Sequence, residues 1–536
     1  MRTLLAVVLG VTVAQIGQPI SSDPVAVDSG RVSGTVLASG VKAYFGIPFA
    51  APPVRDFRWR PPRPVTPWKG VYHADRMAAK CIQNLRDSDL NHYFGEEPTS
   101  EDCLYLNVWA PASARSGQKL PVLVFIYGGG FTQGSSAMAN YSGESLAKKG
   151  VVYASFNYRV GALGFLAHPE LTAEDPHRTS GNWGLLDQVA ALQWVNRNIA
   201  QFGGDPGNVT ILGQSAGSAS VSYLQSSPLA RGLIHRAFGM SGSAVGGRGR
   251  TASLGDGEQS GRRLQEQLKA PSMAEMRRLS AERIYAAQIA AGAPRFQPTV
   301  DGNLLPESPT ALFAASRQND IPLLLSLMRD ESSNALRAAK TADEYRSAAR
   351  QLYGDKAGDF LALYPAATDA DVPSAGAKAA REAGMETTMR SWALAQVKTG
   401  KAPVYMSMFS RVHPYVDGVT FSDHNPKTVG AYHTGEVPYW LQTQDAYNLF
   451  RPTRNWTAYD RDLANKLSDA LVAFARTGNP STPALAWPRY DPAHEQMMEF
   501  GDAIRVLPMN TKGLDFFRAL TVTVPSTAIP AVGYPQ

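Results

Sequence analysis

Residues 209–217, VTILGQSAG, contain the feature that decides the fold. The apolar, β-branched run 209–212 is typical of a buried strand, and residues 218–225 are compatible with a helix. A Gly-x-Ser-x-Gly pentapeptide between a strand and a helix is the pattern of a nucleophile elbow. Its glycines leave room for a strained turn that lifts the Ser215 hydroxyl clear of the sheet, near the free N–H groups of the helix N-terminus. Because this pentapeptide also arises by chance in glycine-rich loops, the interpretation needs partner residues elsewhere.

A glycine-rich loop follows an earlier predicted strand. Residues 121–126, PVLVFI, read as a buried strand and lead into 127–131, YGGGF. Three consecutive glycines cost conformational entropy, which indicates that bare backbone is needed there. A hydrolase with a nucleophile elbow places the backbone donors for an oxyanion in such a loop. A phosphate-binding loop is the weaker alternative, since neither of its glycine patterns occurs here.

The remaining pattern is that of an α/β protein with a large, mostly parallel central sheet flanked by helices. Apolar residues recur at three- and four-residue steps over 185–199, as in a helix that packs on a sheet. A hairpin over 32–49 precedes it, and further strands are predicted at 151–156, 321–327 and 404–408. Helices are predicted at 258–291, 309–316, 334–351, 376–398 and 459–476, and those that interrupt the strands are expected to wall a substrate gorge. Without a repeat or a low-complexity linker, residues 23–536 are predicted to form a single domain.

Composition and the N-terminus indicate an exported protein. Residues 1–22 have a basic start and a short apolar run that ends in small residues, which predicts a signal peptide cleaved between 14 and 22 and a secreted or periplasmic protein without a membrane anchor. The two cysteines, Cys81 and Cys103, are then expected to form a disulfide rather than a metal site. The net charge of +6 comes without a basic run interleaved with aromatics, which argues against a nucleic-acid partner.

Activation of a serine requires a base and an orienting acid. In proteins with this elbow the chain order is serine, acid, histidine. Asp330 and Glu331 both follow the predicted strand 321–327 directly, so either fits the acid. The histidines far enough downstream are His413, His424, His433 and His494. Spacing alone does not choose among them.

These residues together resemble the type-B carboxylesterase and cholinesterase family, over nearly the whole mature chain. The resemblance rests on several motifs in the family's order: EDCLYLNV at 101–108, GGGF at 128–131, FGGDP at 202–206, the elbow, and GAYHTGE at 430–436. It implies an α/β-hydrolase fold with helical insertions that form a substrate gorge. It also implies a serine esterase that acts on a small-molecule ester through an acyl-enzyme and needs no cofactor or metal.

The resemblance assigns roles to individual positions. It implies that Ser215 is the nucleophile, Glu331 the orienting acid and His433 the base. The implied oxyanion donors and structural pairs are Gly129, Gly130 and Ala216, the disulfide Cys81–Cys103, and the ion pairs Arg58–Glu101 and Arg159–Asp187.

The chain departs from the family in residues expected around the substrate. Residues 82–102 contain no tryptophan to hold a choline group, and after Ser241 the chain offers Arg248 and Arg250 where many relatives have bulky aromatics. We therefore expect these arginines, together with Phe131, to contact substrate and to favour acyl groups that carry carboxylates, such as fumonisin-type tricarballylic esters. The alternative is that the arginines are solvated loop charges. The alternatives to an esterase are an acyltransferase or amidase with the same triad, or a non-catalytic binding module of the neuroligin kind.

Overall fold

A computed structural model of the chain describes residues 18–19, 24–84, 89–91, 97–246 and 251–523. Apart from Gln18–Pro19, the predicted signal peptide lies outside the described residues, and so do Arg248 and Arg250.

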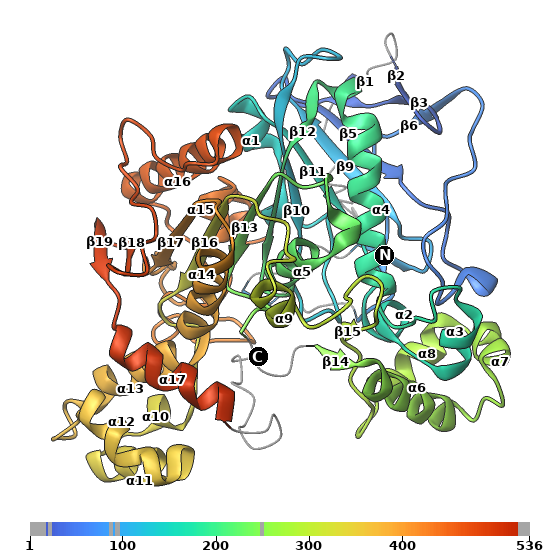
Figure 1. Ribbon diagram of the computed structural model, residues 1–536. Helices are drawn as coiled ribbons and strands as arrows, with labels where there is room; N and C mark the ends of the chain where they lie inside the picture. Colours follow the sequence, from blue (N-terminus) through green and yellow to red (C-terminus); the bar gives the residue numbers. More distant parts are fainter. Residues whose placement is uncertain (1–17, 20–23, 85–88, 92–96, 247–250, 524–536) are drawn as a thin grey trace, which may run out of the picture.

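In this part of the chain, twelve strands form one mixed sheet (Figure 1). The strands from β11 (Val152–Phe156) to β18 (Gln496–Phe500), in sheet order, are parallel, whereas the strands at both edges pair antiparallel. The sheet order is β1 (Gln18–Pro19), β4 (Thr35–Val36), β5 (Lys42–Pro48), β9 (Tyr105–Ala110), β11 (Val152–Phe156), β10 (Leu120–Ile126), β12 (Gly204–Gln214), β13 (Arg236–Met240), β16 (Leu323–Met328), β17 (Val404–Phe409), β18 (Gln496–Phe500) and β19 (Ile504–Pro508). The predicted hairpin is the antiparallel pair β4 and β5.

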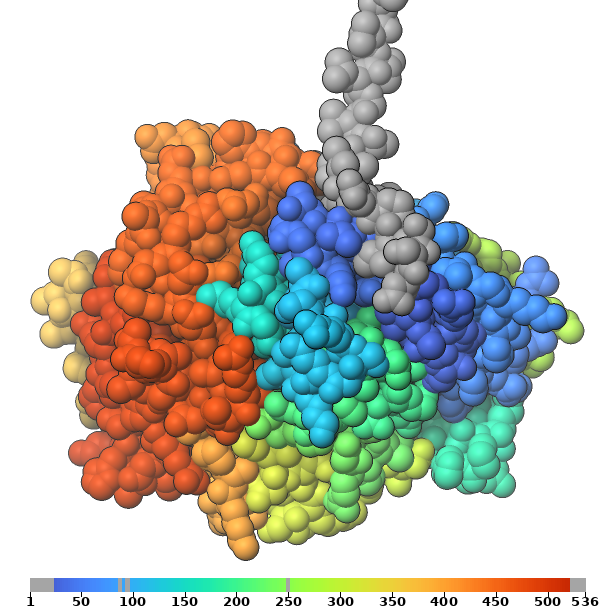
Figure 2. Space-filling view, turned by 90° about the horizontal axis from the view of Figure 1, so that it is seen from above, coloured from blue at the N-terminus to red at the C-terminus, as the bar shows by residue number. Residues whose placement is uncertain are grey.

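Helices cover both faces of the sheet, which explains why its central strands are continuous apolar runs. In Figure 1, α4 (Trp183–Asn198), α5 (Ala216–Ser226) and α14 (Thr387–Thr399) lie on one face, and α1 (Glu144–Lys148) and α16 (Ala458–Thr477) lie on the other. Figure 2 shows the teal segment around α1 beside the orange C-terminal segment, where Lys149 pairs with Asp469 at 2.5 Å. This arrangement is the predicted α/β-hydrolase fold.

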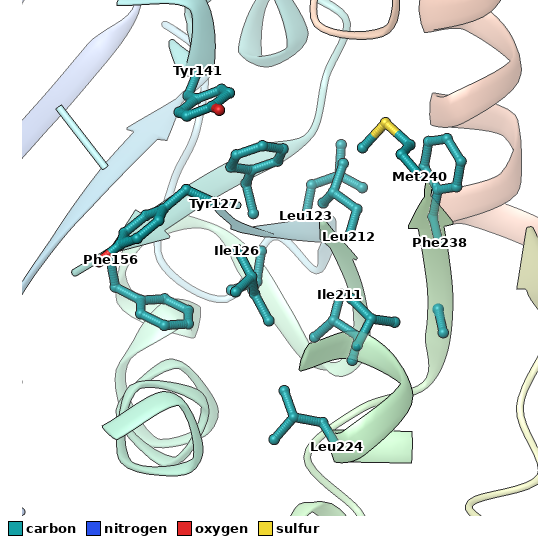
Figure 3. Packing of buried hydrophobic residues seen from close by; sticks show 14 of the residues in the cluster. Leu123, Ile126, Tyr127, Tyr141, Phe156, Ile211, Leu212, Leu224, Phe238 and Met240 are labelled. Atoms are coloured by element: carbon teal, nitrogen blue, oxygen red, sulfur yellow. The ribbon is translucent and has the colours of Figure 1, made fainter. Parts of the chain in front are cut away.

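The core lies between these layers. Figure 3 shows Ile126 of β10 and Ile211 of β12 on the same side of the sheet as Leu224 of α5, with Leu212 of β12 and Phe238 of β13 on the opposite side. All five side chains are fully buried. The apolar stripe predicted over 185–199 is buried along α4. The apolar face of α16 is buried as well, with Leu463, Leu467, Leu471 and Phe474. The elbow, which joins β12 to α5, is therefore packed against this buried core.

Helical insertions extend beyond the sheet. One group consists of α6 (Leu254–Leu268), α7 (Met273–Arg278) and α8 (Ala281–Gln288), into which the single predicted helix 258–291 is divided. A second group has a smaller core of its own, and its members are α10 (Ala335–Ala338), α11 (Ala342–Tyr353), α12 (Ala357–Leu363), α13 (Val372–Arg381) and α17 (Thr511–Thr523). A π-helical turn, Glu382–Glu386, joins α13 to α14.

The remaining elements are short. The helices are α2 (Gly161–Phe165), α3 (Pro169–Glu174), α9 (Pro309–Ala314) and α15 (Val437–Trp440). The small sheets comprise β2 (Val25–Val27), β3 (Gly30–Ser33) and β6 (Val71–His73); β7 (Lys80–Cys81) and β8 (Thr99–Ser100); and β14 (Ala252–Ser253) and β15 (Thr299–Val300). None of the helices in the described residues has the length and apolarity that crossing a bilayer would require.

The cross-links that the resemblance implies are present. Cys81 and Cys103 form a disulfide. Arg58 binds both carboxylate oxygens of Glu101, at 2.7 and 2.6 Å, and Arg159 binds both oxygens of Asp187, at 2.8 and 2.7 Å. Bidentate contacts of this kind fix the relative orientation of the two side chains as well as their distance.

Candidate active site

The elbow places Ser215 between the end of β12 and the start of α5. Its backbone has φ 58° and ψ −121°, a left-handed conformation that is strained for a residue with a side chain. A Cβ on Gly217 would lie 2.0 Å from the carbonyl oxygen of Ile126, and one on Gly213 would lie 2.4 Å from the carbonyl carbon of Gly217. Side chains at these positions would therefore break the packing of the turn against β10. This explains why the pentapeptide requires glycine on both sides.

The three-glycine loop lies directly against this turn. A Cβ on Gly128 would come within 2.5 Å of the carbonyl oxygen of Gln214 and 2.9 Å of the Ser215 Cβ. Gly129 and Gly130 follow with φ values of 113° and 64°, which glycine adopts at little cost. Ala216 is the first residue of α5, so its N–H group has no acceptor within the helix. The structure thus brings the three predicted oxyanion donors to the neighbourhood of Ser215.

Glu331 and His433 meet beneath the elbow, although they lie on loops that follow different strands. Glu331 comes shortly after β16, and His433 lies between β17 and α15. His433 Nδ1 is 2.5 Å from Oε2 of Glu331. Asp330, the alternative that spacing left open, turns away and accepts a hydrogen bond from the Ala431 N–H at 2.8 Å.

Glu331 is buried and its second oxygen is also occupied. Oε1 accepts hydrogen bonds from the N–H of Met328 at 2.8 Å and from the Ser241 hydroxyl at 3.0 Å. These donors hold the carboxylate in one orientation. A carboxylate fixed in this way is suited to orient an imidazole and to stabilise an imidazolium.

The contacts of His433 define its tautomer. A proton on Nδ1 is donated to Glu331, which leaves the lone pair on Nε2. The side-chain Nε2 of Gln214 lies 3.2 Å from this atom and has a hydrogen to donate. Gln214 immediately precedes Ser215, so the basic nitrogen of His433 faces the elbow. This is the orientation that a base acting on the serine hydroxyl requires.

The other downstream histidines have different partners. His413 is buried, with Nε2 at 2.7 Å from the carbonyl oxygen of Gly435, and burial lowers the pKa of its imidazole well below the usual value. His424 contacts Asp423 at 3.0 Å, and His494 contacts Asp491 at 3.1 Å. Among the residues that the structure describes, no three His, Cys, Asp or Glu side chains gather as a metal site would require.

Phe131, a predicted substrate contact, is buried directly after the glycine loop. Its ring packs edge-on against Phe165 at 5.2 Å between centroids and lies 6.3 Å from Tyr223 of α5. The ring therefore forms part of an aromatic wall beside the elbow. Arg248 and Arg250, the other two predicted contacts, lie in the stretch 247–250, outside the described residues.

Glu436, to which the sequence assigned no role, is a second buried carboxyl group close to Glu331. Ser241 contacts it at 3.5 Å and thereby bridges it to Glu331. Burial raises the pKa of Glu436 to about 7 and the charge of Glu331 acts in the same direction, against the hydrogen bonds from Ser326 and Trp440. The glutamate belongs to the motif at 430–436, but its partners come from distant segments that spacing does not connect: Ser326 lies in β16, and Ser241 directly follows β13.

We expect Glu436 to make the stability of the protein fall with rising pH. The folded state holds the proton of this group up to about pH 7, whereas the unfolded chain releases it near 4.5. Raising the pH through this window therefore favours unfolding, by about 2.5 kcal/mol between pH 5 and 8. Glu436→Gln stays neutral, so its free energy of unfolding should gain that amount relative to the parent over the same interval, as measured by urea unfolding. Parallel pH profiles for the two proteins would contradict this role.

Three comparisons with known proteins point to one family. The family model described as "Carboxylesterase family" matches residues 21–516. The chain is 36% identical over 486 residues to a fumonisin B1 esterase of Sphingopyxis macrogoltabida, covering 89% of this chain and 86% of that protein. It is 33% identical over 494 residues to a para-nitrobenzyl esterase of Bacillus subtilis (strain 168), covering 88% and 92%. A solved structure of a thermophilic PNB esterase superposes with a TM-score of 0.76 at 30% identity, over 92% of this chain and 99% of that one.

Proposed function

Because the chain belongs to the carboxylesterase family and is a carboxylic ester hydrolase, we propose that it cleaves esters with the triad Ser215, His433 and Glu331 through an acyl-enzyme. The observation that carries this proposal is the 2.5 Å contact between Glu331 and His433 beneath the elbow. It supplies the orienting acid and the base that a serine nucleophile requires.

Acylation proceeds in two steps. His433 Nε2 takes the proton of the Ser215 hydroxyl while the serine oxygen forms a bond to the ester carbonyl carbon. The N–H groups of Gly129, Gly130 and Ala216 donate to the resulting oxyanion, in a position where charge develops only during the reaction. The intermediate then collapses, the bond to the alcohol oxygen breaks, and His433 returns its proton to the departing alcohol.

Deacylation repeats the sequence with water as the nucleophile. His433 removes a proton from the water, the hydroxide oxygen bonds to the acyl carbon, and the bond to Ser215 breaks as the serine recovers its proton. The products are the free acid and the unmodified enzyme. This chemistry uses only side chains and backbone groups of the chain, and no cofactor or metal has a role in it.

The acyl-enzyme is tested by rapid mixing with an aryl ester whose phenol absorbs light. We expect a burst of phenol close to one equivalent per protein, and mass spectrometry of a quenched sample should find the acyl group on the peptide that contains Ser215. An acyl group found on a residue other than Ser215 would overturn the proposal. A burst of phenol without any acyl group on the protein would overturn it as well. An added alcohol acceptor identifies the class of reaction: a transferred ester as the main product would indicate an acyltransferase, which is the alternative.

For the substrate, we propose an ester whose acyl group carries carboxylates, of the fumonisin-type tricarballylic kind. The similarity to a protein named fumonisin B1 esterase supports this choice. Arg248, Arg250 and Phe131 are the residues proposed to contact it.

We also propose that the protein is secreted or periplasmic after cleavage of a signal peptide. The disulfide Cys81–Cys103 supports this location, because such bonds persist in oxidising compartments.

A further inference from the structure

A cleft of about 320 Å³ opens between α6 and the segment that leads into β15. These elements lie in green at the lower right of Figure 1, beside α2. The residues that give the cleft its chemistry are Phe165, Asp256, Ser260, Arg263, Arg295 and Phe296. Its volume falls in the range that small-molecule sites occupy.

The charges in this cleft are predominantly positive. Arg263 comes from α6 and Arg295 from the segment before β15, so their side chains approach from two sides. Within the described residues neither arginine forms an ion pair. The one lining carboxylate, Asp256, is engaged at the start of α6, where its Oδ2 accepts a hydrogen bond from the Ser253 hydroxyl at 2.7 Å. Two guanidinium groups thus remain to bind an anion.

Two contacts link the cleft to the proposed catalytic centre. The ring of Phe165 lines the cleft and packs against Phe131, the residue that follows the oxyanion donor Gly130. On the other side, the hydroxyl of Tyr223 in α5 is 2.8 Å from that of Thr251, which directly precedes the strand β14 beside the cleft. These contacts place the cleft next to the aromatic residues that flank the elbow.

We propose that this cleft binds the carboxylate-bearing part of the ester substrate, with Arg263 and Arg295 as its cationic contacts and Phe165 and Phe296 as its apolar lining. The planar fork of a guanidinium matches the two oxygens of a carboxylate. The inference rests on the proposed function, since it supplies a subsite for the same reaction, formed by residues other than Arg248 and Arg250.

The test compares two esters of the same alcohol, one with a tricarboxylic acyl group and one with a neutral acyl group of similar length. We expect the double variant Arg263→Gln, Arg295→Gln to lose about tenfold in kcat/KM toward the carboxylate ester, mainly through KM, because the lost contacts act in ground and transition state alike. The neutral ester should change by less than about twofold. Arg263→Gln alone should show part of this loss, and Arg262→Gln is its matched control, since it removes one charge from the adjacent position of α6 but does not line the cleft.

Several outcomes would overturn the subsite. One is an equal loss for both esters, and another is a loss in Arg262→Gln equal to that in Arg263→Gln. Inhibition by free citrate supplies a further readout: competition with the carboxylate ester that weakens in the double variant supports the subsite, whereas non-competitive inhibition indicates a separate anion site and contradicts it. Hydrolysis of the neutral ester, with Ser215→Ala as its control, reports on the catalytic proposal independently.

Discussion

Replacement of Ser215 by alanine is expected to lower kcat for ester hydrolysis by about 10⁴- to 10⁶-fold. The serine oxygen forms the covalent bond in the proposed mechanism, and alanine leaves His433 without a hydroxyl to activate. The oxyanion donors and the binding site remain, so a small rate above that of water should persist. The measurement is hydrolysis of a neutral aryl ester by the purified variant, with circular dichroism to verify that it is folded.

Ser220→Ala is the matched control for this prediction. Ser220 lies on α5, the helix that begins directly after Ser215, is fully buried, and accepts a hydrogen bond from Gln188 on the neighbouring helix α4 at 3.0 Å. Its loss should affect stability by about 1 kcal/mol and leave kcat within a few-fold of the parent. Activity in Ser215→Ala that stays within tenfold of this control would place the nucleophile on another residue.

The elbow and the sheet could be predicted from sequence because their signals are local. The steric demands of one turn fix both glycines around Ser215, and buried parallel strands require apolar runs such as 121–126. The division of 258–291 into three helices also had a local signal. Ser272 and Ser280 accept hydrogen bonds from the N–H groups of Glu275 and Arg283 and thereby begin α7 and α8.

The parts of the site that residue spacing did not supply depend on contacts between distant segments. Asp330 and Glu331 are adjacent, and only the folded loop decides which of them faces His433; the family resemblance supplied that choice. Ser241 lies 90 residues from Glu331, and Ser326 lies 110 residues from Glu436. The cleft combines arginines from a helix and a loop that no spacing rule relates. Tertiary packing alone brings these groups together.

Glu331→Gln is expected to lower kcat by about 10⁴-fold while the fold persists. The amide has nearly the shape of the carboxylate, so its oxygen can keep the hydrogen bonds from Met328 and Ser241. The group that faces His433 Nδ1 is then an NH₂ donor, which favours the tautomer with the proton on Nε2. That tautomer has no lone pair directed at Ser215, and the variant also lacks the charge that stabilises an imidazolium. Single-turnover hydrolysis of an aryl ester measures the acylation step directly.

Asp330→Asn provides the control that separates the two adjacent acids. It removes one negative charge at the neighbouring position, and its side-chain oxygen can still accept the hydrogen bond from the Ala431 N–H that shapes the histidine loop. We expect kcat to fall by less than about tenfold, because this side chain orients the loop without contacting the imidazole. The reverse result, a large loss in Asp330→Asn and a small one in Glu331→Gln, would assign the orienting role to Asp330. It would also mean that the 2.5 Å contact of Glu331 with His433 is not the one used in catalysis.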